Sequence, residues 1–392
     1  MMPAARVQAA IEILDLVIAA AAHNGAPADR IISEWFRTRR FAGSKDRRAV
    51  RELAYRAIRV CGEVPQSGRA AMLRLAHDDA PLLALFDGSG HGPAPVKDGE
   101  PVAEGGTAPL WLERRLRSSN VVGQEAEALL DRAPLDIRVN ALKAARDTID
   151  LPVEVEPTHA PHGLRLPTGT QVEQWPAFRD GLVEVQDSGS QMACAAVEAR
   201  PGETVIDLCA GAGGKTLALA AAMENRGTLI ASDTDRGRLS RFAPRAERAG
   251  VTIAQTLLLN PGKELDSLRP WQGKADAVLI DAPCSGTGTW RRNPEARWRL
   301  DKPALARNVA LQVRLLDLAS GLVKEGGRLI YVTCSLLDEE GQDQISAFLA
   351  RKPGWTAQIP ALPAGVQRGQ GMRLSPHHDG TDGFFIAQLR RL

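Results

Sequence analysis

The sequence predicts an α/β fold with a mixed, mostly parallel sheet, preceded by an all-α domain. Apolar residues recur at helical spacing almost throughout residues 5–86, with no convincing strand alternation. From about residue 181 onward, short β-rich runs alternate with helical ones. This alternation is typical of parallel strands joined by right-handed crossovers.

The elements of the second part can be assigned in chain order. Strands are expected at residues 204–209, 228–233, 251–258, 275–280 and 328–333. Helices are expected between them at residues 215–224, 236–249 and 302–324. The closing stretch 383–389 (GFFIAQL) is expected to form a last edge strand in antiparallel orientation.

The chain of 392 residues is long enough for two or three domains, because one core rarely serves such a length. We expect a helical domain at 1–86 and a second domain at 145–392. Residues 87–109 are rich in Gly and Pro, which predicts a flexible loop or linker. Residues 110–144 are expected to connect the two domains through a helical stretch and a short strand near 136–143.

Composition narrows the class of protein. The alanine-rich start is predicted to be an amphipathic helix and not a signal peptide, because Glu12 and Asp15 interrupt it. Every long apolar stretch is broken before the roughly 20 residues that a membrane helix needs. The five cysteines are far apart and form no CxxC pair, which predicts no metal site, no disulfide framework and a cytoplasmic location. We expect a monomer.

Two clusters of basic residues are more informative than the net charge of +2, since 49 Lys and Arg residues nearly balance 47 Asp and Glu residues. Such clusters suit contacts to phosphates. An ordinary solvated face explains either cluster equally well. The first cluster comprises Arg37, Arg39, Arg40, Lys45, Arg47, Arg48 and Arg51, and the second comprises Arg291, Arg292, Arg297 and Arg299.

The first predicted strand of the sheet leads into a glycine-rich turn and then a helix. In a doubly wound sheet such a turn lies at the carboxyl ends of the strands, where small residues let the backbone approach a ligand. A Walker A loop would need Gly in place of Cys209, and a dinucleotide loop would need Gly in place of Thr216. The turn therefore predicts a nucleotide-like cofactor of another kind, bound by Cys209, Ala210, Gly211, Ala212, Gly213, Gly214 and Lys215.

Asp233 ends the second predicted strand. A carboxylate at this position can accept hydrogen bonds from both ribose hydroxyls of an adenosine. The alternative is a cap for the following helix. Adenosyl binding without a need for pyrophosphate fits S-adenosylmethionine.

Two cysteines follow strands. Cys284 lies in the turn DAPCSGTG (281–288) after the fourth strand, and Cys334 lies in TCS (333–335) after the fifth. Because parallel strands end on one edge of a sheet, both cysteines are expected to converge on the cofactor pocket. An isolated cysteine is more often a core residue, and we expect this of Cys61, Cys194 and also Cys209.

From about residue 111 to the end, the chain resembles the Sun/Nop family of RNA cytosine carbon-5 methyltransferases, especially the bacterial 16S ribosomal RNA members. The family's DLCAAPGGKT-like, DAPCSGTG-like and TCS motifs are matched by residues 207–216, 281–288 and 333–335. Smaller matches are residues 138–140 with 142–143, 186–191 and 382–385. The resemblance implies a class I, Rossmann-like methyltransferase domain. More loosely, the helical part resembles a NusB-like RNA-binding domain.

The sequence departs from the family pattern at two places. Gly211-Ala212 stands where the family commonly has Ala-Pro, which should loosen the turn without removing backbone donors. Asn260 follows the third predicted strand where the family commonly has an Asp on the adenine side of the cofactor. An amide could still pair there, so Asn260 is kept as a cofactor-binding candidate.

The resemblance implies covalent catalysis. Carbon 5 of cytosine is a poor nucleophile until a thiolate adds at carbon 6, and the family pattern assigns that thiolate to Cys334. Cys284 is associated with release of the product. Asp281 is expected to donate to ring nitrogen 3 if it holds a proton, and to contact the cofactor. In DNA cytosine methyltransferases the Pro-Cys cysteine is the nucleophile, so the presence of both motifs favours RNA.

The target base must leave its stack to be attacked, which favours a cytosine in a single-stranded region or a loop. Arg291 and Arg292 are the RNA-contact candidates near the second motif, with Trp290 either stacking on a base or forming part of the core.

The alternative functions are those of a transfer RNA methyltransferase and of a catalytically idle RNA-binding factor in ribosome assembly. The intact cysteines argue against the idle factor. Docking of RNA, most plausibly 16S ribosomal RNA, is expected at Arg39, Arg40, Arg47 and Arg48.

Overall fold

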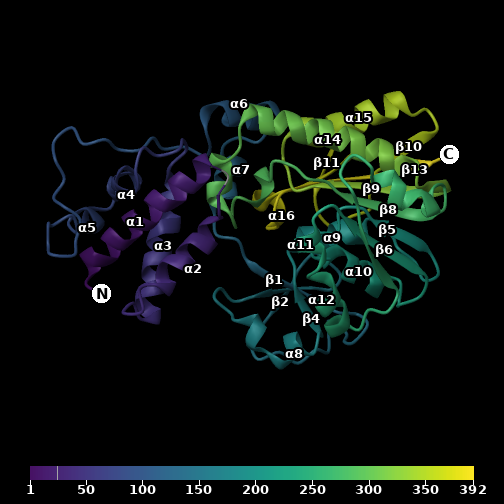
Figure 1. Cartoon of the computed structure of the whole chain (residues 1–392), viewed down its shortest axis with the longest axis horizontal. Coiled ribbons are helices and arrows are strands. Elements are labelled where there is room, and N and C mark those ends of the chain that lie inside the picture. Colours follow the sequence, from purple (N-terminus) through teal and green to yellow (C-terminus); the bar gives the residue numbers. More distant parts are fainter. Residues whose placement is uncertain (24) are drawn as a thin grey trace. The chain divides into compact units, whose positions relative to one another are not determined.

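The computed structural model describes residues 1–23 and 25–392 and divides into two compact units. The first comprises Met1–Arg132 with Thr289–Asp301, and the second comprises Ala133–Gly288 with Lys302–Leu392. Figure 1 shows the course of the chain. The division differs from the expected one, since it falls after residue 132 and transfers residues 289–301 to the helical unit.

The first unit is helical, as the apolar spacing predicts. Its core gathers large apolar side chains from successive helices, among them Leu14, Ile32, Ile58 and Met72. Among the described residues from 1 to 86, the one β-type pairing is a bridge between Cys61 and Gly105. The helices are α1 (Pro3–Ala22), α2 (Ala28–Arg37), α3 (Ser44–Val60), α4 (Gly68–Ala76), α5 (Ala80–Leu83), α6 (Leu110–Ser118), α7 (Gln124–Glu127) and η1 (Ala128–Leu130).

The Gly- and Pro-rich segment 87–109 does not connect the two units. Its backbone returns to the helices, where Ala103 N donates to the Ala70 carbonyl at 3.2 Å. Arg69 Nη2 also donates to Glu100 Oε2 at 3.0 Å. The segment has the irregular structure that its composition predicts, but hydrogen bonds anchor it within the first unit.

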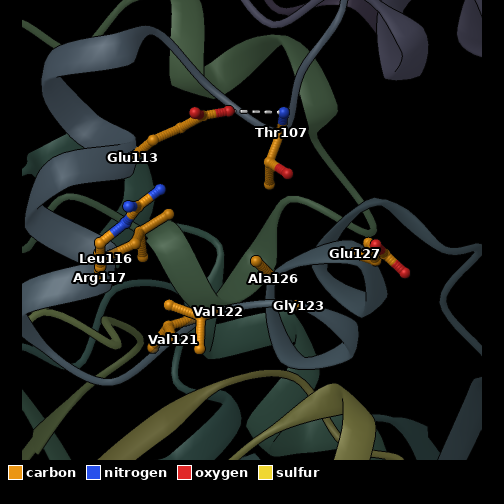
Figure 2. A pocket seen from close by; sticks show the side chains of 9 residues that line it. All are labelled: Thr107, Glu113, Leu116, Arg117, Val121, Val122, Gly123, Ala126 and Glu127. Carbon is orange, nitrogen blue, oxygen red and sulfur yellow. Dashed lines mark hydrogen bonds between the residues drawn. The ribbon is translucent and has the colours of Figure 1, made fainter.

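A pocket lies where this segment leads into α6 (Figure 2). Glu113 Oε1 accepts hydrogen bonds from the backbone N–H groups of Thr107 (2.9 Å) and Ala108 (3.2 Å). The pocket contains none of the residues predicted to take part in chemistry. The lining consists of Thr107, Glu113, Leu116, Arg117, Val121, Val122, Gly123, Ala126 and Glu127.

Residues 289–301, including η5 (Pro294–Trp298), pack within the helical unit. Arg297 is fully buried, and its Nη2 donates to the carbonyls of Ile58 (2.6 Å) and Cys61 (2.9 Å) at the end of α3. These carbonyls are among the groups that a helix C-terminus leaves unsatisfied. Glu295 Oε1 accepts from the Ala28 N–H at 2.9 Å, at the start of α2.

Arg299 makes similar contacts, donating at 2.6 Å to the carbonyls of both Gly25 and Ala26. Two members of the second basic cluster, Arg297 and Arg299, therefore bind backbone carbonyls of this unit. The interpretation of that cluster as a phosphate-binding surface is wrong for these two residues. Charge spacing in the sequence could not distinguish a buried arginine from an exposed one.

The second unit contains a large sheet with the strand order β11-β12-β13-β9-β8-β5-β6-β7, and β10 also pairs with β13. Strands β5 to β9 run parallel, and β13 is antiparallel to β9. This is the predicted mixed, mostly parallel sheet. Its strands are β5 (Thr204–Asp207), β6 (Thr228–Asp233), β7 (Ala254–Leu258), β8 (Ala275–Asp281), β9 (Val323–Thr333), β10 (Trp355–Gln358), β11 (Val366–Arg368), β12 (Gly371–Leu374) and β13 (Phe384–Arg391).

One expectation about this sheet is wrong. β13 is an interior strand, because β9 pairs with one side of it and β10 and β12 with the other. Its residues 384–389 are all buried, a continuous pattern that an interior strand covered on both faces produces.

Helices cover both faces of the large sheet (Figure 1). One face carries α9 (Ser188–Ala195), α10 (Gly214–Ala222) and α12 (Phe242–Ala249). The other carries α13 (Glu264–Leu268), α14 (Lys302–Ser320) and α15 (Gln342–Arg351). The helix expected at 236–249 is divided into α11 (Arg236–Leu239) and α12, and the one expected at 302–324 ends at Ser320.

A second, antiparallel sheet has the order β2-β3-β1-β4. Its strands are β1 (Leu135–Val139), β2 (Glu156–Pro157), β3 (Gly163–Leu166) and β4 (Val183–Val185). It covers its own small core, which includes Ile137 and Trp175. The shorter helices are η2 (Val172–Gln174), α8 (Pro176–Arg179), η3 (Arg269–Trp271), η4 (Thr287–Thr289), η6 (Asp338–Glu340) and α16 (Pro376–Asp379).

No helix among the described residues combines the length and apolar character needed to cross a membrane.

Candidate active site

The glycine-rich turn lies between the end of β5 and the start of α10. Gly213 has a left-handed backbone with φ of 81°, and a Cβ there would lie 2.0 Å from Phe242 Cδ2. Gly211 is also left-handed, with φ of 56°. Both positions therefore require glycine, because the backbone is left-handed and a Cβ would collide with Phe242 at Gly213 or with Arg238 at Gly211.

Asp233, at the end of β6, holds this turn. Its side chain is only 7% exposed, with Oδ2 accepting from the Gly211 N–H and Oδ1 from the Asp235 N–H, each at 2.7 Å. The cap of α11 is Asp235, which accepts from Arg238 N at 2.9 Å. The alternative role of Asp233 as a helix cap is therefore excluded. Its carboxylate retains lone pairs for further donors.

Lys215 and Asp281 form an ion pair that no local pattern in the sequence indicates. Lys215 Nζ lies 2.6 Å from Asp281 Oδ2 and joins the glycine-rich turn to the end of β8. Burial alone would lower the pKa of Lys215, but the neighbouring Asp281 carboxylate outweighs burial and the pKa is raised. Asp207 is fully buried nearby and accepts a hydrogen bond from Thr216 Oγ1 at 2.6 Å. Burial raises the pKa of the Asp207 carboxyl to about 7.

The structure brings together the two cysteines that follow β8 and β9. Their sulfur atoms, Cys284 Sγ and Cys334 Sγ, are 3.4 Å apart, and both residues are half-buried. The hydrogen bond to Cys334, together with burial, raises the pKa of the Cys284 thiol well above its ordinary value.

The other three cysteines lie apart from this pair. Cys61 and Cys194 are buried, as predicted, and Cys209 is half-buried in the glycine-rich turn. Burial raises the pKa of Cys61 to about 12 and that of Cys194 to about 11. Burial also raises the pKa of Cys209 well above its ordinary value. Only Cys284 and Cys334 combine partial exposure with a neighbouring thiol among the described residues.

Backbone contacts hold both cysteine turns against the start of β13. Gly288 N donates to the Cys334 carbonyl at 3.0 Å, and Gly383 N donates to the Gly288 carbonyl at 2.8 Å. A Cβ on Gly288 would lie 2.1 Å from the Gly383 carbonyl oxygen. This close approach requires glycine at position 288, the last residue of the 281–288 motif.

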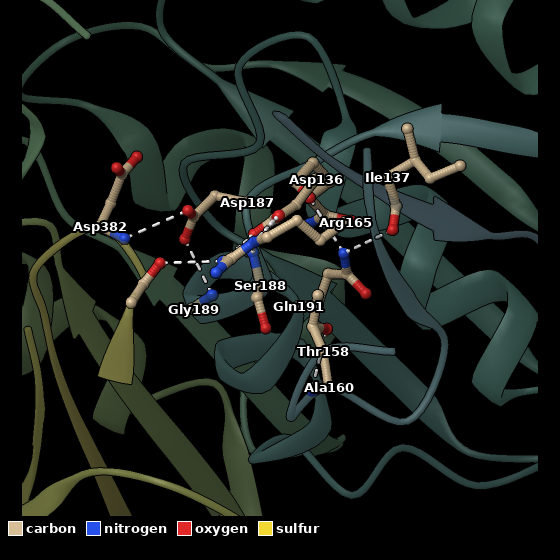
Figure 3. A network of polar contacts seen from close by, with 12 residues as sticks. Asp136, Ile137, Thr158, Ala160, Arg165, Asp187, Ser188, Gly189, Gln191 and Asp382 are labelled. Carbon is tan, nitrogen blue, oxygen red and sulfur yellow. Dashed lines mark hydrogen bonds and ion pairs between the residues drawn. The ribbon is translucent and has the colours of Figure 1, made fainter. Parts of the chain in front are cut away.

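The smaller motifs form a polar network beside the site (Figure 3). Arg165 binds Asp136 through two hydrogen bonds of 2.8 and 3.0 Å and donates to the Gly380 carbonyl at 2.9 Å. Asp187 caps α9 through Oδ1, and its Oδ2 accepts from Asp382 N at 3.1 Å. The network fixes the loop before β13, and so the Gly383 backbone that contacts the cysteine turns.

The remaining candidate residues are distributed as follows. Asn260 is exposed two residues beyond β7, and no described contact assigns it to the site. Trp290 is fully buried, so it is a core residue and not an exposed stacking platform. Arg291 is only 5% exposed, whereas Arg292 is half-buried; both belong to the first unit. Burial of Arg291 contradicts its expected place on an open RNA-binding surface.

The first basic cluster also belongs to the first unit. Arg39 stacks on Trp35, 4.0 Å from the ring centroid, and lies 3.4 Å from Glu12. Arg47 donates to the Ala42 carbonyl at 2.8 Å. The exposed residues of the cluster are Arg37, Arg40, Lys45, Arg47, Arg48 and Arg51.

Several residues of the site escaped sequence reasoning. Glu340 is fully buried and accepts hydrogen bonds from the Ser285 backbone and side chain. Arg245 donates to the Ala212 carbonyl of the glycine-rich turn at 2.7 Å. Neither residue belongs to a recognisable motif, because each contacts the site from a segment that is distant in the sequence. Among the described residues, no group of three or more His, Cys, Asp or Glu side chains is arranged to hold a metal ion.

Comparison with known proteins agrees with this geometry. The family model described as 16S rRNA methyltransferase RsmB/F matches residues 194–390. The ribosomal RNA small subunit methyltransferase B of Citrobacter koseri is 37% identical over 294 residues, covering 72% of this chain and 66% of that protein. The protein of the same name from Xylella fastidiosa (strain 9a5c) is 36% identical over 294 residues, covering 72% of this chain and 68% of that protein.

A further relative, the probable ribosomal RNA small subunit methyltransferase B of Synechocystis, is 35% identical over 272 residues. The matched part of the chain spans 60% of that protein's length and, as given above, 66% of the Citrobacter protein. The chain thus spans less than two thirds of the length of the Synechocystis and Citrobacter proteins.

Among solved structures, the crystal structure of PH0851 has a TM-score of 0.77 to this chain at 27% identity, covering 100% of this chain and 99% of that one. A methyltransferase homologue from Pyrococcus horikoshii has a TM-score of 0.62 at 28% identity, covering 72% and 95%. These similarities confirm the predicted Rossmann-like methyltransferase fold. With a family model matching half of the chain and relatives above 30% identity, the chain belongs to the 16S rRNA methyltransferase RsmB/F family.

Proposed function

We propose that the chain transfers a methyl group from S-adenosylmethionine to carbon 5 of a cytosine in RNA, with 16S ribosomal RNA as its substrate. The observation that carries this proposal is the 3.4 Å separation of Cys284 Sγ and Cys334 Sγ, at the same sheet edge as the glycine-rich turn. The names of the relatives, ribosomal RNA small subunit methyltransferases, support the choice of RNA.

The residues around the turn fit the cofactor. The turn of small residues lies between β5 and α10, at the carboxyl end of the strand where a ligand would approach, and Asp233 retains lone pairs for ribose hydroxyls. Residues 209–215 with Asp233 are the proposed binding residues. Asp281 is connected to the proposed cofactor site by its ion pair with Lys215. Asn260 is a secondary candidate for binding the cofactor. The cofactor supplies an electrophilic methyl group that none of the protein's side chains can provide.

The chain's own residues supply the covalent steps. The Cys334 thiolate adds to carbon 6 of the cytosine, which forms a C–S bond and makes carbon 5 nucleophilic. The Lys215 and Asp281 pair is assigned the role of donor to the charge that develops on the ring. After carbon 5 gains the methyl group, its proton leaves to a base or water, and the C–S bond breaks with its electrons returning to Cys334.

Cys284 acts when the C–S bond breaks and the methylated product is released. Its thiol lies within hydrogen-bonding distance of the departing Cys334 sulfur, and its raised pKa keeps it protonated as a donor. A donor beside the leaving sulfur stabilises the thiolate as the C–S bond breaks. The two cysteines therefore have different roles although they touch.

A direct assay tests the function. The purified chain is incubated with 16S ribosomal RNA, transfer RNA and methyl-labelled S-adenosylmethionine, and the RNA is digested to nucleosides. We expect labelled 5-methylcytidine from 16S ribosomal RNA. Label in transfer RNA alone would replace the proposed substrate, and RNA binding without label would identify an idle assembly factor. Bisulfite sequencing of RNA from a deletion strain would then locate the nucleotide.

Asp233→Ala should weaken binding of S-adenosylmethionine by about tenfold to a hundredfold, because hydrogen bonds to a charged group contribute about 1.5–3 kcal/mol. Titration calorimetry measures the change. Asp235→Ala is the matched control, since it removes the cap of α11 two residues away and should lower stability by about 1 kcal/mol without weakening binding. Equal affinities for Asp233→Ala and the unaltered chain would contradict the ribose assignment.

The first basic cluster is proposed to dock RNA through phosphates. Replacing Arg40, Arg48 and Arg51 by Gln should weaken RNA binding and reduce the slope of log K against log salt by about 0.7–0.9 per lost phosphate contact. Phosphate contacts position RNA without reading its sequence, so the loss should be similar for unrelated structured RNAs.

The matched control replaces three exposed arginines that precede the amino ends of the parallel strands, Arg200, Arg226 and Arg269. These lie at the edge of the sheet opposite the cysteines, so the salt slope should not change. An unchanged slope in the Arg40, Arg48 and Arg51 variant would mean that the cluster is only a solvated face.

A further inference from the structure

Glu340 is a fully buried acidic residue behind the two cysteines. It ends η6, with one residue separating it from the start of α15, and its side-chain oxygens accept hydrogen bonds from three groups. Ser285 N lies 2.8 Å from Oε1 and 3.1 Å from Oε2, the Ser285 hydroxyl donates to Oε2, and Gln312 Nε2 lies 3.2 Å from Oε1. Among the described residues, no Lys, Arg or His forms an ion pair with it.

These contacts enclose Cys284 on both sides along the chain. Gln312, buried on α14, donates to the Pro283 carbonyl at 2.9 Å as well as to Glu340. Ser285, on the other side of Cys284, is bound through its N–H and its hydroxyl. The position of the Cys284 backbone therefore depends on the Glu340 carboxylate.

A chain of hydroxyl groups continues from Glu340 to the Cys334 turn. Ser285 Oγ lies 3.1 Å from Ser335 Oγ, which lies 3.2 Å from Thr287 Oγ1. Ser335 directly follows Cys334, so this chain couples the two turns. Leu336 N donates to Thr287 Oγ1 and Leu337 N to Ser335 Oγ, at 2.9 and 3.1 Å.

The carboxylate sets the direction of this chain. Ser285 has one hydroxyl hydrogen and gives it to Glu340. The bond between Ser285 and Ser335 must then use the hydrogen of Ser335, and the bond between Ser335 and Thr287 must use that of Thr287. Every hydroxyl donates toward Glu340, so one acceptor orders all three.

We propose that Glu340 is a positioning residue for the cysteine pair: its carboxylate fixes the turn that carries Cys284 and orients the hydroxyl chain to the Cys334 turn. The proposal rests on the function proposed above. No motif includes Glu340, which reaches Ser285 across 55 positions of the sequence.

The charges around Cys284 agree with this role. The pKa of its thiol is raised by the hydrogen bond to Cys334, by burial, by the charge of Cys334 and by the charge of Glu340, in decreasing order. The backbone N–H of Gly286 lowers it slightly. Tyr331 of β9 donates to the Glu340 backbone carbonyl at 2.9 Å, and its pKa is raised well above its ordinary value by burial and by the charges of Cys284 and Glu340. Glu340 is thus the carboxylate that disfavours ionisation of Cys284.

Glu340→Gln keeps the shape of the side chain and removes its charge. An amide nitrogen at the Oε1 position would oppose the donors Ser285 N and Gln312 Nε2. At the Oε2 position it would donate to the Ser285 hydroxyl and reverse the hydroxyl chain. We expect kcat to fall by about tenfold to a hundredfold with little change in KM for either substrate, because binding surfaces are untouched.

A second readout needs neither RNA nor cofactor. In a Cys334→Ser background, Cys284 is the one thiol of the pair, and its alkylation by iodoacetamide is followed by peptide mass spectrometry as pH is varied. Adding Glu340→Gln to this background removes the Glu340 charge and should lower the pH midpoint of Cys284 alkylation by about one unit. Glu325→Gln, the same change at an exposed position of the second unit, is the control and should leave the midpoint unchanged.

Ser335→Ala provides a variant that leaves Glu340 in place, should Glu340→Gln not fold. It interrupts the hydroxyl chain, so kcat should fall while the Cys284 midpoint stays near that of the parent. An unchanged midpoint in Glu340→Gln, or an unchanged kcat in Ser335→Ala, would overturn the proposal. The alkylation result is independent of methyl transfer, so its failure is distinguishable from failure of the proposed function.

Discussion

Cys334→Ala should reduce methyl transfer by about four orders of magnitude or more and should form no covalent complex with RNA. No other described thiol contacts the position that Cys334 occupies except Cys284, whose pKa is raised. Without addition at carbon 6, carbon 5 stays unreactive and the rate of the whole reaction is lost. The measurement is incorporation of labelled methyl groups into 16S ribosomal RNA, with denaturing gel electrophoresis of the protein and labelled RNA for the adduct.

Cys194→Ala is the matched control for the loss of a thiol. Cys194 is buried on α9 and its Sγ donates to the Ser190 carbonyl at 3.2 Å, away from the cysteine pair. Its replacement should lower stability modestly and leave methyl transfer largely intact. A Cys334→Ala protein that still methylates RNA would remove Cys334 from the chemistry.

Cys284→Ala should behave in the opposite manner and accumulate a covalent complex between protein and RNA. Attack by Cys334 and methylation of carbon 5 do not require Cys284, but release loses the donor 3.4 Å from the departing sulfur. The complex should survive denaturation and appear as a shifted band on the same gel. Turnover should fall to about one methyl group per protein molecule, since each enzyme stays bound to its first product.

Which of the two variants forms a covalent adduct decides which cysteine is the nucleophile. An adduct from Cys334→Ala and none from Cys284→Ala would make Cys284 the nucleophile, as in the DNA cytosine methyltransferases. The double variant Cys284→Ala with Cys334→Ala should form no adduct, which shows whether the trapped bond depends on the Cys334 sulfur. Because both sulfurs occupy the same small site, position alone cannot assign these roles and the trapping experiment is required.

Much of the second unit followed from the sequence. The order of strands and helices, the glycine-rich turn after β5 and the cysteines after β8 and β9 are local features. Each depends on periodicity or on residues that adjoin a strand end. The convergence of Cys284 and Cys334 also followed, because parallel strands end on one edge. Local patterns predicted the ends of helices less well, since the helix expected at 302–324 ends at Ser320.

Only the tertiary structure decided the contacts between distant segments. The pairing of Lys215 with Asp281, the contact of Glu340 with Ser285 and the pairing of β13 with β9 each join residues or strands separated by more than 40 positions. The same holds for Arg297, which binds carbonyls of α3 more than 230 positions away. A sequence records which side chains can donate or accept, but burial and direction depend on how the chain packs. For this protein, the sequence therefore predicted that the two thiols meet at one edge of the sheet, and packing determined which buried groups hold them 3.4 Å apart.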